Sequence, residues 1–340
     1  MREIDKFFNL PYFTGESLDE LAEKCKEPRK PIIDGLIYED TGVMFFADDG
    51  IGKSLLTFQI ICEASVGLPV FGYFQCPKPV RTLWCQMERH PRELGERYKK
   101  FSSVFKPSSN NIILTTKLQG LDIKKESDWK KIMDIIHEII LTEGDVNLIV
   151  FDPIYCMVSG DLSEPATVAY VNRFSQQIQN IFNVTTLFIT HSNRGIKIQT
   201  GKLKGQRTQG DFFGSRFLRA HFSTVYHISR RSDGGFGSHW KLDKDSIALP
   251  CDEFFLDFDQ ESFLSRIDPA MLDNKERVAN VLRQWETSGR EFTNLQLSTA
   301  CQLPSKVIEN LRLRDMKLAF KDSGKRNGIS RIYTSEISKI

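Results

Sequence analysis

The sequence predicts an α/β fold with a mostly parallel sheet, followed by a small C-terminal winged-helix domain. Short apolar runs alternate with helical periodicity between Thr41 and Thr190, and the first run, Val43–Ala47, has the length of a buried strand. Three helical segments and a hairpin close the chain after Asp273, which is typical of a winged helix. The expected parts are an N-terminal arm over residues 1–30, a core domain over 31–268 and the winged helix over 269–340.

The core domain is expected to begin with the strand Val43–Ala47 and the helix Lys53–Ser65. Further strands are expected at 81–87, 111–116, 147–151 and 185–189, with helices at 91–101, at 129–141 and after Pro165. In the last of these helices, apolar residues step by three and four, which predicts one buried face: Val168, Val171, Phe174, Ile178 and Phe182. Three later strand-like segments are expected to extend the same sheet: 223–229, 238–242 and 253–257.

The winged helix is predicted from 269 onward. Its helices are expected from Asp273 through Trp285, over Asn294–Cys301, and from Pro304 to about Met316, with proline at a first helical turn. Turn-forming residues in Lys321–Gly328 predict a hairpin tip.

Composition excludes several classes of protein. The formal net charge of +2 is too small to indicate nucleic acid or a membrane unless basic residues cluster locally. No apolar run reaches the roughly 18 residues of a membrane span, and the first residues lack a signal-peptide pattern, so we expect a cytoplasmic protein without a membrane partner. The seven cysteines are odd in number and scattered, which argues against a disulfide framework or a zinc site.

A phosphate-binding loop is predicted between the first strand and its helix. Gly50 and Gly52 allow backbone N–H groups to face phosphates, Lys53 can reach the β and γ phosphates, and Ser54 can bind Mg²⁺. The usual first glycine is replaced by Ala47. The expected nucleotide contacts are Ala47, Gly50, Ile51, Gly52, Lys53, Ser54 and Leu55, with ATP and Mg²⁺ as ligands. The alternative is a glycine-rich turn before an ordinary helix.

Two later strands end in acids. Asp152 follows four apolar residues and is the candidate carboxylate beside Mg²⁺, which it would hold through a bound water, although a turn or helix-capping aspartate has the same pattern. Glu88 directly follows the strand Arg81–Met87 and is the candidate group that orients the attacking water; the alternative is an exposed strand-end acid.

Together, the P-loop, Val70-Phe71-Gly72, the strand ending at Glu88, Leu148–Asp152 and Leu187–Ser192 resemble the RecA-fold ATPases of the RepA and DnaB hexameric helicase group. The resemblance covers about Pro31 to Asp259. It implies a RecA-like core in which the strand ending at His191 lies between the P-loop strand and the Asp152 strand. His191 would then sense the γ-phosphate, although a lone histidine is more often structural.

The resemblance also implies hexamers with a basic residue completing each site from a neighbouring subunit. The chain departs from the pattern here, because Phe213 and Ser246 stand where these helicases carry arginines. The candidates for this trans finger are Arg216, Arg219 and Lys244.

Two clusters of basic residues indicate DNA as a partner. The first lies on the loop 193–210, which contains no acid and whose equivalent holds single-stranded DNA in the resembling helicases: Arg194, Lys197, Lys202, Lys204 and Arg207. The second lies in the winged helix, where it would contact duplex DNA: Lys306, Arg312, Arg314, Lys325 and Arg326. A solvated loop and a protein-interaction module are the respective alternatives.

The sequence therefore predicts a hexameric, DNA-stimulated ATPase of the helicase type that acts in replication of a plasmid, phage or mobile element. Two other functions stay open: an ATP-switched initiator or regulator that does not unwind DNA, and a RecA-like recombination or repair ATPase.

Overall fold

A computed structural model describes most of the chain. The described residues are 14–47, 50–162, 164–191, 218, 221–231, 236–247, 253–268, 277–279, 281–282, 285–286, 290–301, 303–314, 320–327 and 330–335. The chain divides into two compact units: the first comprises Met1–Glu253 and Phe258–Ser265, the second Phe254–Asp257 and Arg266–Ile340. Within the described residues, no helix combines the length and apolarity needed to cross a bilayer.

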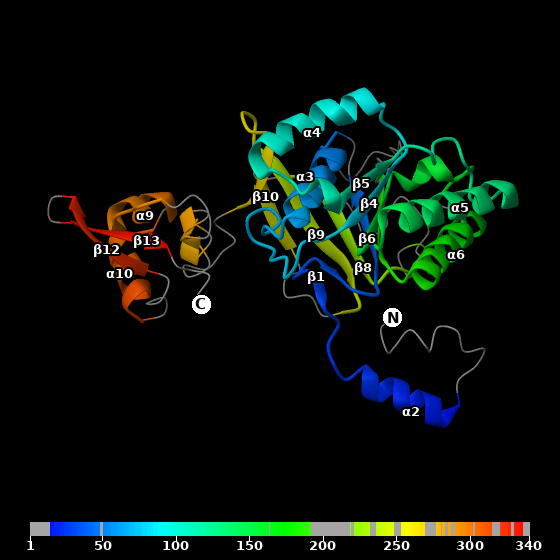
Figure 1. Cartoon of the computed structure of the whole chain (residues 1–340), viewed down its shortest axis with the longest axis horizontal. Coiled ribbons are helices and arrows are strands. Elements are labelled where there is room, and N and C mark those ends of the chain that lie inside the picture. The colour runs from blue at the N-terminus through cyan, green and yellow to red at the C-terminus, as the bar shows by residue number, and fades with distance from the viewer. Residues whose placement is uncertain are drawn as a thin grey trace, which may run out of the picture. The chain divides into compact units, whose positions relative to one another are not determined.

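The central sheet has nine strands in the order β11-β10-β9-β8-β3-β7-β6-β4-β5 (Figure 1). Their bounds are β3 Gly42–Ala47, β4 Thr82–Gln86, β5 Ile112–Thr115, β6 Leu148–Asp152, β7 Thr185–His191, β8 Thr224–Arg230, β9 Gly237–Asp245, β10 Glu253–Asp259 and β11 Leu264–Ile267. The pairs from β8 through β3, β7, β6 and β4 to β5 are all parallel, whereas β9 runs antiparallel to β8. The predicted mostly parallel sheet is confirmed, and so is the place of β7 between β3 and β6.

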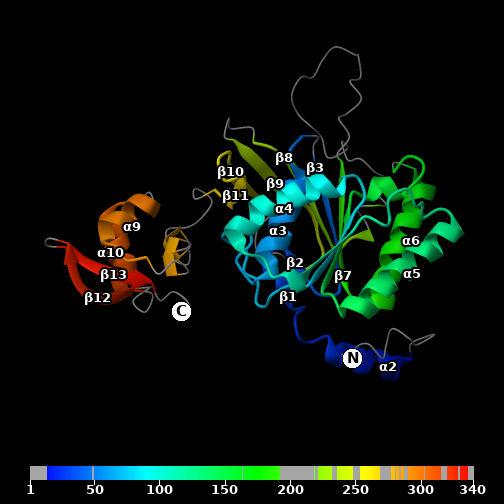
Figure 2. The same ribbon diagram turned by 45° about the horizontal axis from the view of Figure 1, so that its top comes forward.

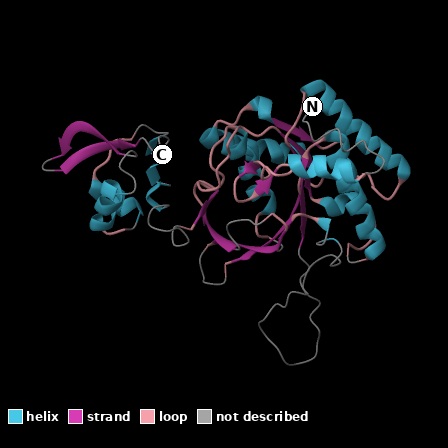
Figure 3. Ribbon diagram, turned by 90° about the horizontal axis from the view of Figure 1, so that it is seen from below, coloured by secondary structure: helices cyan, strands magenta, loops and turns pink. Residues whose placement is uncertain are grey.

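Helices cover both faces of this sheet (Figures 2 and 3). They are α3 Lys53–Ser65, α4 Pro91–Phe105, α5 Glu126–Glu143 and α6 Pro165–Phe182, with short 3-10 helices η1 Ser109–Asn111 and η2 Ile154–Met157. Because strand side chains alternate, Met44 and Phe46 of β3 belong to the core that packs on α5 and α6. On the other face, Phe58 of α3 packs on Trp84 of β4, with ring centroids 4.9 Å apart.

Most predicted elements agree with the structure within a few residues. Strand β3 is completely buried, as its uninterrupted apolar run predicted, and α3 has the predicted bounds. Helix α6 buries four residues of its predicted stripe, whereas Phe182 is only partly buried. Helix α4 continues to Phe105, four residues beyond its predicted end, and buries that residue. Strand β11 was not predicted, because four residues are too few for a clear alternating pattern.

The N-terminal arm contains α2, Gly15–Lys24, which begins with a capping box formed by Thr14 and Ser17. A small antiparallel pair follows, formed by β1, Pro31–Ile33, and β2, Ile37–Tyr38.

The second unit contains α9, Asn294–Cys301, α10, Ser305–Arg314, and the antiparallel hairpin of β12, Phe320–Asn327, and β13, Ser330–Ser335. The predicted hairpin tip at Lys321–Gly328 is wrong, because β12 occupies nearly all of that segment. Its turn-forming residues coincide instead with a shift of register between Asp322 and Arg326, where an irregularity absorbs residues that do not pair. The winged-helix assignment stays a prediction.

Candidate nucleotide site

The predicted site residues meet at one edge of the sheet. Strands β3, β4, β6 and β7 are parallel, so the segments that follow their carboxyl ends lie side by side. This edge brings together the P-loop after β3, Glu88 after β4, Asp152 at the end of β6 and His191 at the end of β7. Four segments that lie far apart in the sequence thus converge because of strand order alone.

The two glycines before α3 have backbone angles that suit a phosphate-binding loop. Gly50 and Gly52 have φ values of +71° and +87°, and residues other than glycine rarely adopt such angles. A Cβ on Gly50 would also lie 3.3 Å from Nη2 of Arg230, so a side chain there would displace the Arg230 guanidinium by a few tenths of an ångström. The first turn of α3 contains no acidic residue, and its N-terminal dipole therefore favours an anion. Ser54 and Leu55 are half-buried in that turn.

Lys53 and His191 are in direct contact. Nζ of Lys53 donates to the carbonyl of Ala47 at 3.4 Å and lies 2.8 Å from Nδ1 of His191. Since an ammonium group can only donate, Nδ1 is the acceptor in this contact. The P-loop lysine is thereby tied to the strand that the sequence predicted to carry the γ-phosphate sensor.

Further hydrogen bonds connect His191 through Tyr155 to Glu88. The hydroxyl of Tyr155 donates to Oε1 of Glu88 at 3.0 Å and lies 3.1 Å from Nε2 of His191. Because the single phenolic proton is used on Glu88, Nε2 of His191 must donate to the tyrosine oxygen. Burial, followed by the bond to Glu88, raises the pKa of Tyr155, which keeps that proton on the oxygen. Lys53, His191, Tyr155 and Glu88 therefore form one hydrogen-bonded chain with a consistent direction of donation.

A second connection joins Glu88 to Asp152 through Gln86. The buried Gln86 donates from Nε2 to Oδ2 of Asp152 at 3.3 Å. Its Oε1 accepts from the backbone N–H groups of Glu88 at 2.6 Å and Arg89 at 2.8 Å. One amide thus fixes the turn that carries Glu88 and orients the Asp152 carboxylate. The Glu88 side chain remains exposed and can face water.

The residues present fit a magnesium ion. Asp152 is only 2% exposed, and burial, reinforced by the nearby charge of Glu88, raises the pKa of its carboxyl group to about 6. A cation beside this carboxylate would offset the unfavourable burial of its charge. Carboxylate and hydroxyl oxygens are ligands that Mg²⁺ prefers, and Mg²⁺ takes its remaining ligands from water and phosphate. Ser54 and Asp152 are the residues that would hold it.

The other predicted residues lie on other elements or outside the described residues. Lys244 lies on β9, where it pairs with Val225 of β8, and it contributes to lowering the pKa of His221, for which burial is the larger cause. Lys306 is exposed on α10. The remaining winged-helix candidates fall on α10 (Arg312, Arg314) and on β12 (Lys325, Arg326). Outside the described residues lie Arg194, Lys197, Lys202, Lys204, Arg207, Arg216 and Arg219.

Three residues of the site were missed by sequence reasoning. Tyr155 lies in η2, just beyond the strand that carries Asp152, and Gln86 lies just before Glu88. Both residues are polar and lie close in sequence to acids at strand ends. This position is the sequence feature that could have identified them as site residues. Arg230 ends β8, whose parallel pairing with β3 places it beside the P-loop, and no local pattern predicts that pairing.

Residues 13–195 match the family described as an AAA domain, and the match includes the P-loop, Glu88, Asp152 and His191. Among solved structures, the chain is similar to a KaiC-like protein from the hyperthermophilic archaeon Pyrococcus horikoshii OT3. That similarity has 12% sequence identity and a TM-score of 0.46, and it covers 71% of this chain and 100% of the archaeal chain. No curated protein matches this chain.

Proposed function

The chain belongs to the AAA domain family, and from that premise we propose that it is a DNA-stimulated P-loop ATPase of the hexameric helicase type. The observation that carries the proposal is the contact between Lys53 and His191. The P-loop lysine is held by the last residue of β7, and the sequence continues from that residue into a segment with five basic residues. One strand end therefore adjoins both the phosphate site and the segment expected to bind single-stranded DNA.

Hydrolysis would proceed by attack of a water molecule on the γ-phosphorus. Glu88 is exposed and fixed by two partners, so it can orient this water and accept its proton while the bond to the bridging oxygen of ADP breaks. Lys53 would neutralise the charge that develops on the phosphate oxygens. Mg²⁺ held by Ser54 and Asp152 would stabilise the same charge.

The hydrogen-bonded chain gives His191 its sensor role in this proposal. A phosphate oxygen binds an ammonium group more strongly than an imidazole nitrogen does, so bound ATP would draw Lys53 away from His191. His191 would then be released to reorient the loop that follows β7, while Tyr155 keeps its hydrogen bond to Glu88. This coupling is reciprocal for binding, because any change that DNA makes in nucleotide affinity must equal the change that nucleotide makes in DNA affinity.

The test compares two triple variants of the full chain. Replacement of Lys202, Lys204 and Arg207 by alanine should keep basal ATPase and remove stimulation by single-stranded DNA. It should also reduce the log–log salt slope of DNA binding by about 0.7 for each phosphate that the variant no longer neutralises. The control replaces three exposed lysines elsewhere, Lys117, Lys130 and Lys131, and removes the same charge. Equal stimulation in both triple variants would remove the loop from the mechanism.

Oligomerisation is tested by mixing subunits. Inactive Lys53→Ala subunits mixed with subunits lacking Arg216, Arg219 or Lys244 should recover activity at hybrid interfaces if one of these residues acts in trans. Full activity of a dilute monomer would contradict a shared site. Site-specific binding of duplex DNA without stimulation of ATPase would favour the initiator instead of the helicase.

A further inference from the structure

A pocket of about 390 Å³ opens on the other side of the P-loop from Glu88 and Asp152. In the sheet, β7, β6 and β4 lie on one side of β3, and β8 and β9 lie on the other. The pocket is lined by Gly50, Ile51 and Gly52 of the P-loop, by the first turns of α3 and by the ends of β8 and β9. It therefore shares a wall with the phosphate site, and its volume lies within the range of small-molecule sites.

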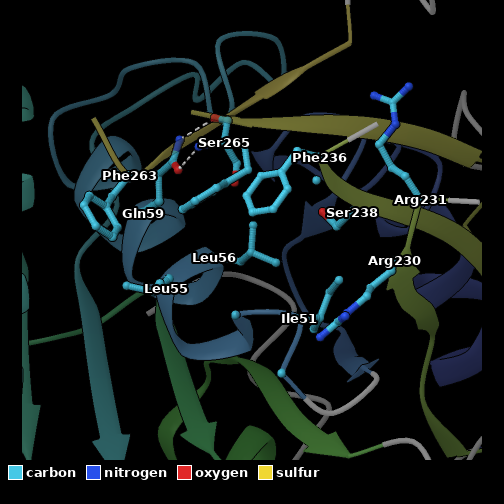
Figure 4. A pocket seen from close by; sticks show the side chains of 14 residues that line it. Ile51, Leu55, Leu56, Gln59, Arg230, Arg231, Phe236, Ser238, Phe263 and Ser265 are labelled. Atoms are coloured by element: carbon cyan, nitrogen blue, oxygen red, sulfur yellow. Dashed lines mark hydrogen bonds between the residues drawn. The ribbon is translucent and has the colours of Figure 1, made fainter. Parts of the chain in front are cut away.

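The wall opposite the P-loop is aromatic. The ring centroids of Phe236 and Phe258 are 5.7 Å apart, and those of Phe258 and Phe263 are 6.1 Å apart. The backbone N–H of Phe258 donates to the carbonyl of Phe236 at 2.9 Å, which links the two segments that carry these rings. Phe236 is 61% exposed and Phe263 is 37% exposed, so both lining rings leave apolar surface open to water. Figure 4 shows the Phe236 ring directed into the pocket toward Leu56.

The polar groups of the pocket are unevenly distributed. Gln59 uses both ends of its amide on Ser265, donating to the carbonyl at 2.7 Å and accepting the backbone N–H at 2.8 Å. The hydroxyl of Ser238 accepts the indole N–H of Trp240 at 3.0 Å. Arg230 is directed toward Ile51 at the P-loop end of the pocket (Figure 4). A flat ligand in this pocket meets cationic charge at the P-loop end and apolar faces along its length.

We propose that this pocket binds the base of the nucleotide whose phosphates occupy the P-loop, and that it recognises the face of a purine rather than its edge. The proposal rests on the proposed nucleotide-binding function. Aromatic stacking covers the exposed Phe236 ring and tolerates any purine, because adenine and guanine have similar π faces. The amide of Gln59 is already engaged by Ser265, so it does not read the base edge. Because the only side-chain amide among the described lining residues is thus engaged, ATP and GTP should bind with affinities within about tenfold of each other.

The test measures calorimetric affinities of the full chain for Mg-ATP, Mg-GTP and inorganic tripolyphosphate. Phe236→Ala should weaken both nucleotides by about 5- to 150-fold, the effect of removing one base–aromatic stack, and leave tripolyphosphate unchanged. Ile181→Ala is the matched control, because Ile181 is also 61% exposed and lies on α6 outside the pocket. Phe236→Trp should retain nucleotide affinity, and its fluorescence should be quenched by ATP but not by tripolyphosphate.

The outcomes separate this inference from the function on which it rests. If neither nucleotide nor tripolyphosphate binds, the P-loop assignment fails and the base site fails with it. If ATP binds, and Phe236→Ala has no more effect than Ile181→Ala, the nucleotide function stands and the base site is elsewhere. If GTP binds about a hundredfold more weakly than ATP, the edge is read and the proposed recognition by stacking is wrong.

Discussion

Replacing Tyr155 with phenylalanine would remove one oxygen atom from the middle of the chain that joins Lys53 to Glu88. The variant lacks the bond of 3.0 Å donated to the Glu88 carboxylate and the hydrogen bond of 3.1 Å with His191. A hydrogen bond to a charged group is worth about 1.5–3 kcal/mol, so removal of the bond that fixes Glu88 should lower kcat by about 10- to 150-fold. Nucleotide affinity should change little, because the tyrosine acts on the carboxylate that orients water.

The assay is steady-state ATPase with saturating Mg²⁺, combined with calorimetric nucleotide binding and a thermal unfolding curve. Tyr170→Phe makes the same chemical change on α6, away from the hydrogen-bonded chain, and should match the unchanged protein. Wild-type kcat in Tyr155→Phe would refute a positioning role for this hydroxyl. An increased kcat would show that the chain restrains Glu88 in the nucleotide-free protein instead of preparing it for catalysis.

Three further predictions concern the loop, a thiol and the core. Gly50→Ala should weaken nucleotide binding, measured by calorimetry, because a residue with φ of +71° would be strained by about 1–2 kcal/mol and its Cβ would displace Arg230; unchanged affinity would contradict the described loop. Burial raises the pKa of Cys62 to about 12, so this thiol stays protonated at mildly alkaline pH and should resist iodoacetamide while the exposed Cys25 reacts; equal labelling rates in the native protein would contradict its burial. Phe174→Ala should lower the free energy of unfolding, measured in urea, by about 3–5 kcal/mol, because the ring is completely buried; a decrease below about 1 kcal/mol would contradict its place in the core.

Local pattern predicted the strands and helices but not the contacts between them. The run Val43–Ala47 is buried on both faces, which is why an uninterrupted apolar stretch was a reliable sign of a strand. The position of β7 between β3 and β6 came from the resemblance to RecA-fold ATPases, since periodicity carries no information about strand order. The prediction of the hairpin tip was wrong because turn-forming residues also occur where a strand has an irregularity in its pairing.

The candidate site was predicted only where a residue stands at a recognisable place in the pattern. Lys53, Glu88 and Asp152 stand at or near the ends of apolar runs, where sequence alone suggests a role. Tyr155 contacts Glu88 across 67 positions of sequence, and no repeat or spacing connects them. The aromatic wall of the pocket could not be predicted for the same reason. Phe236 and Phe258 become neighbours only when β9 and β10 join the sheet.

A double-mutant cycle on kcat with Tyr155→Phe and Glu88→Gln tests the central claim most directly. In the proposed mechanism the tyrosine acts on hydrolysis through the Glu88 carboxylate, to which its hydroxyl donates. We expect Glu88→Gln to keep nucleotide binding and to reduce turnover. In that background, removal of the Tyr155 hydroxyl should have little additional effect on kcat. The double variant should hydrolyse ATP at the rate of Glu88→Gln alone. If the two reductions in kcat instead multiply, the residues act independently, and the hydrogen-bonded chain is not the unit that prepares the site for hydrolysis.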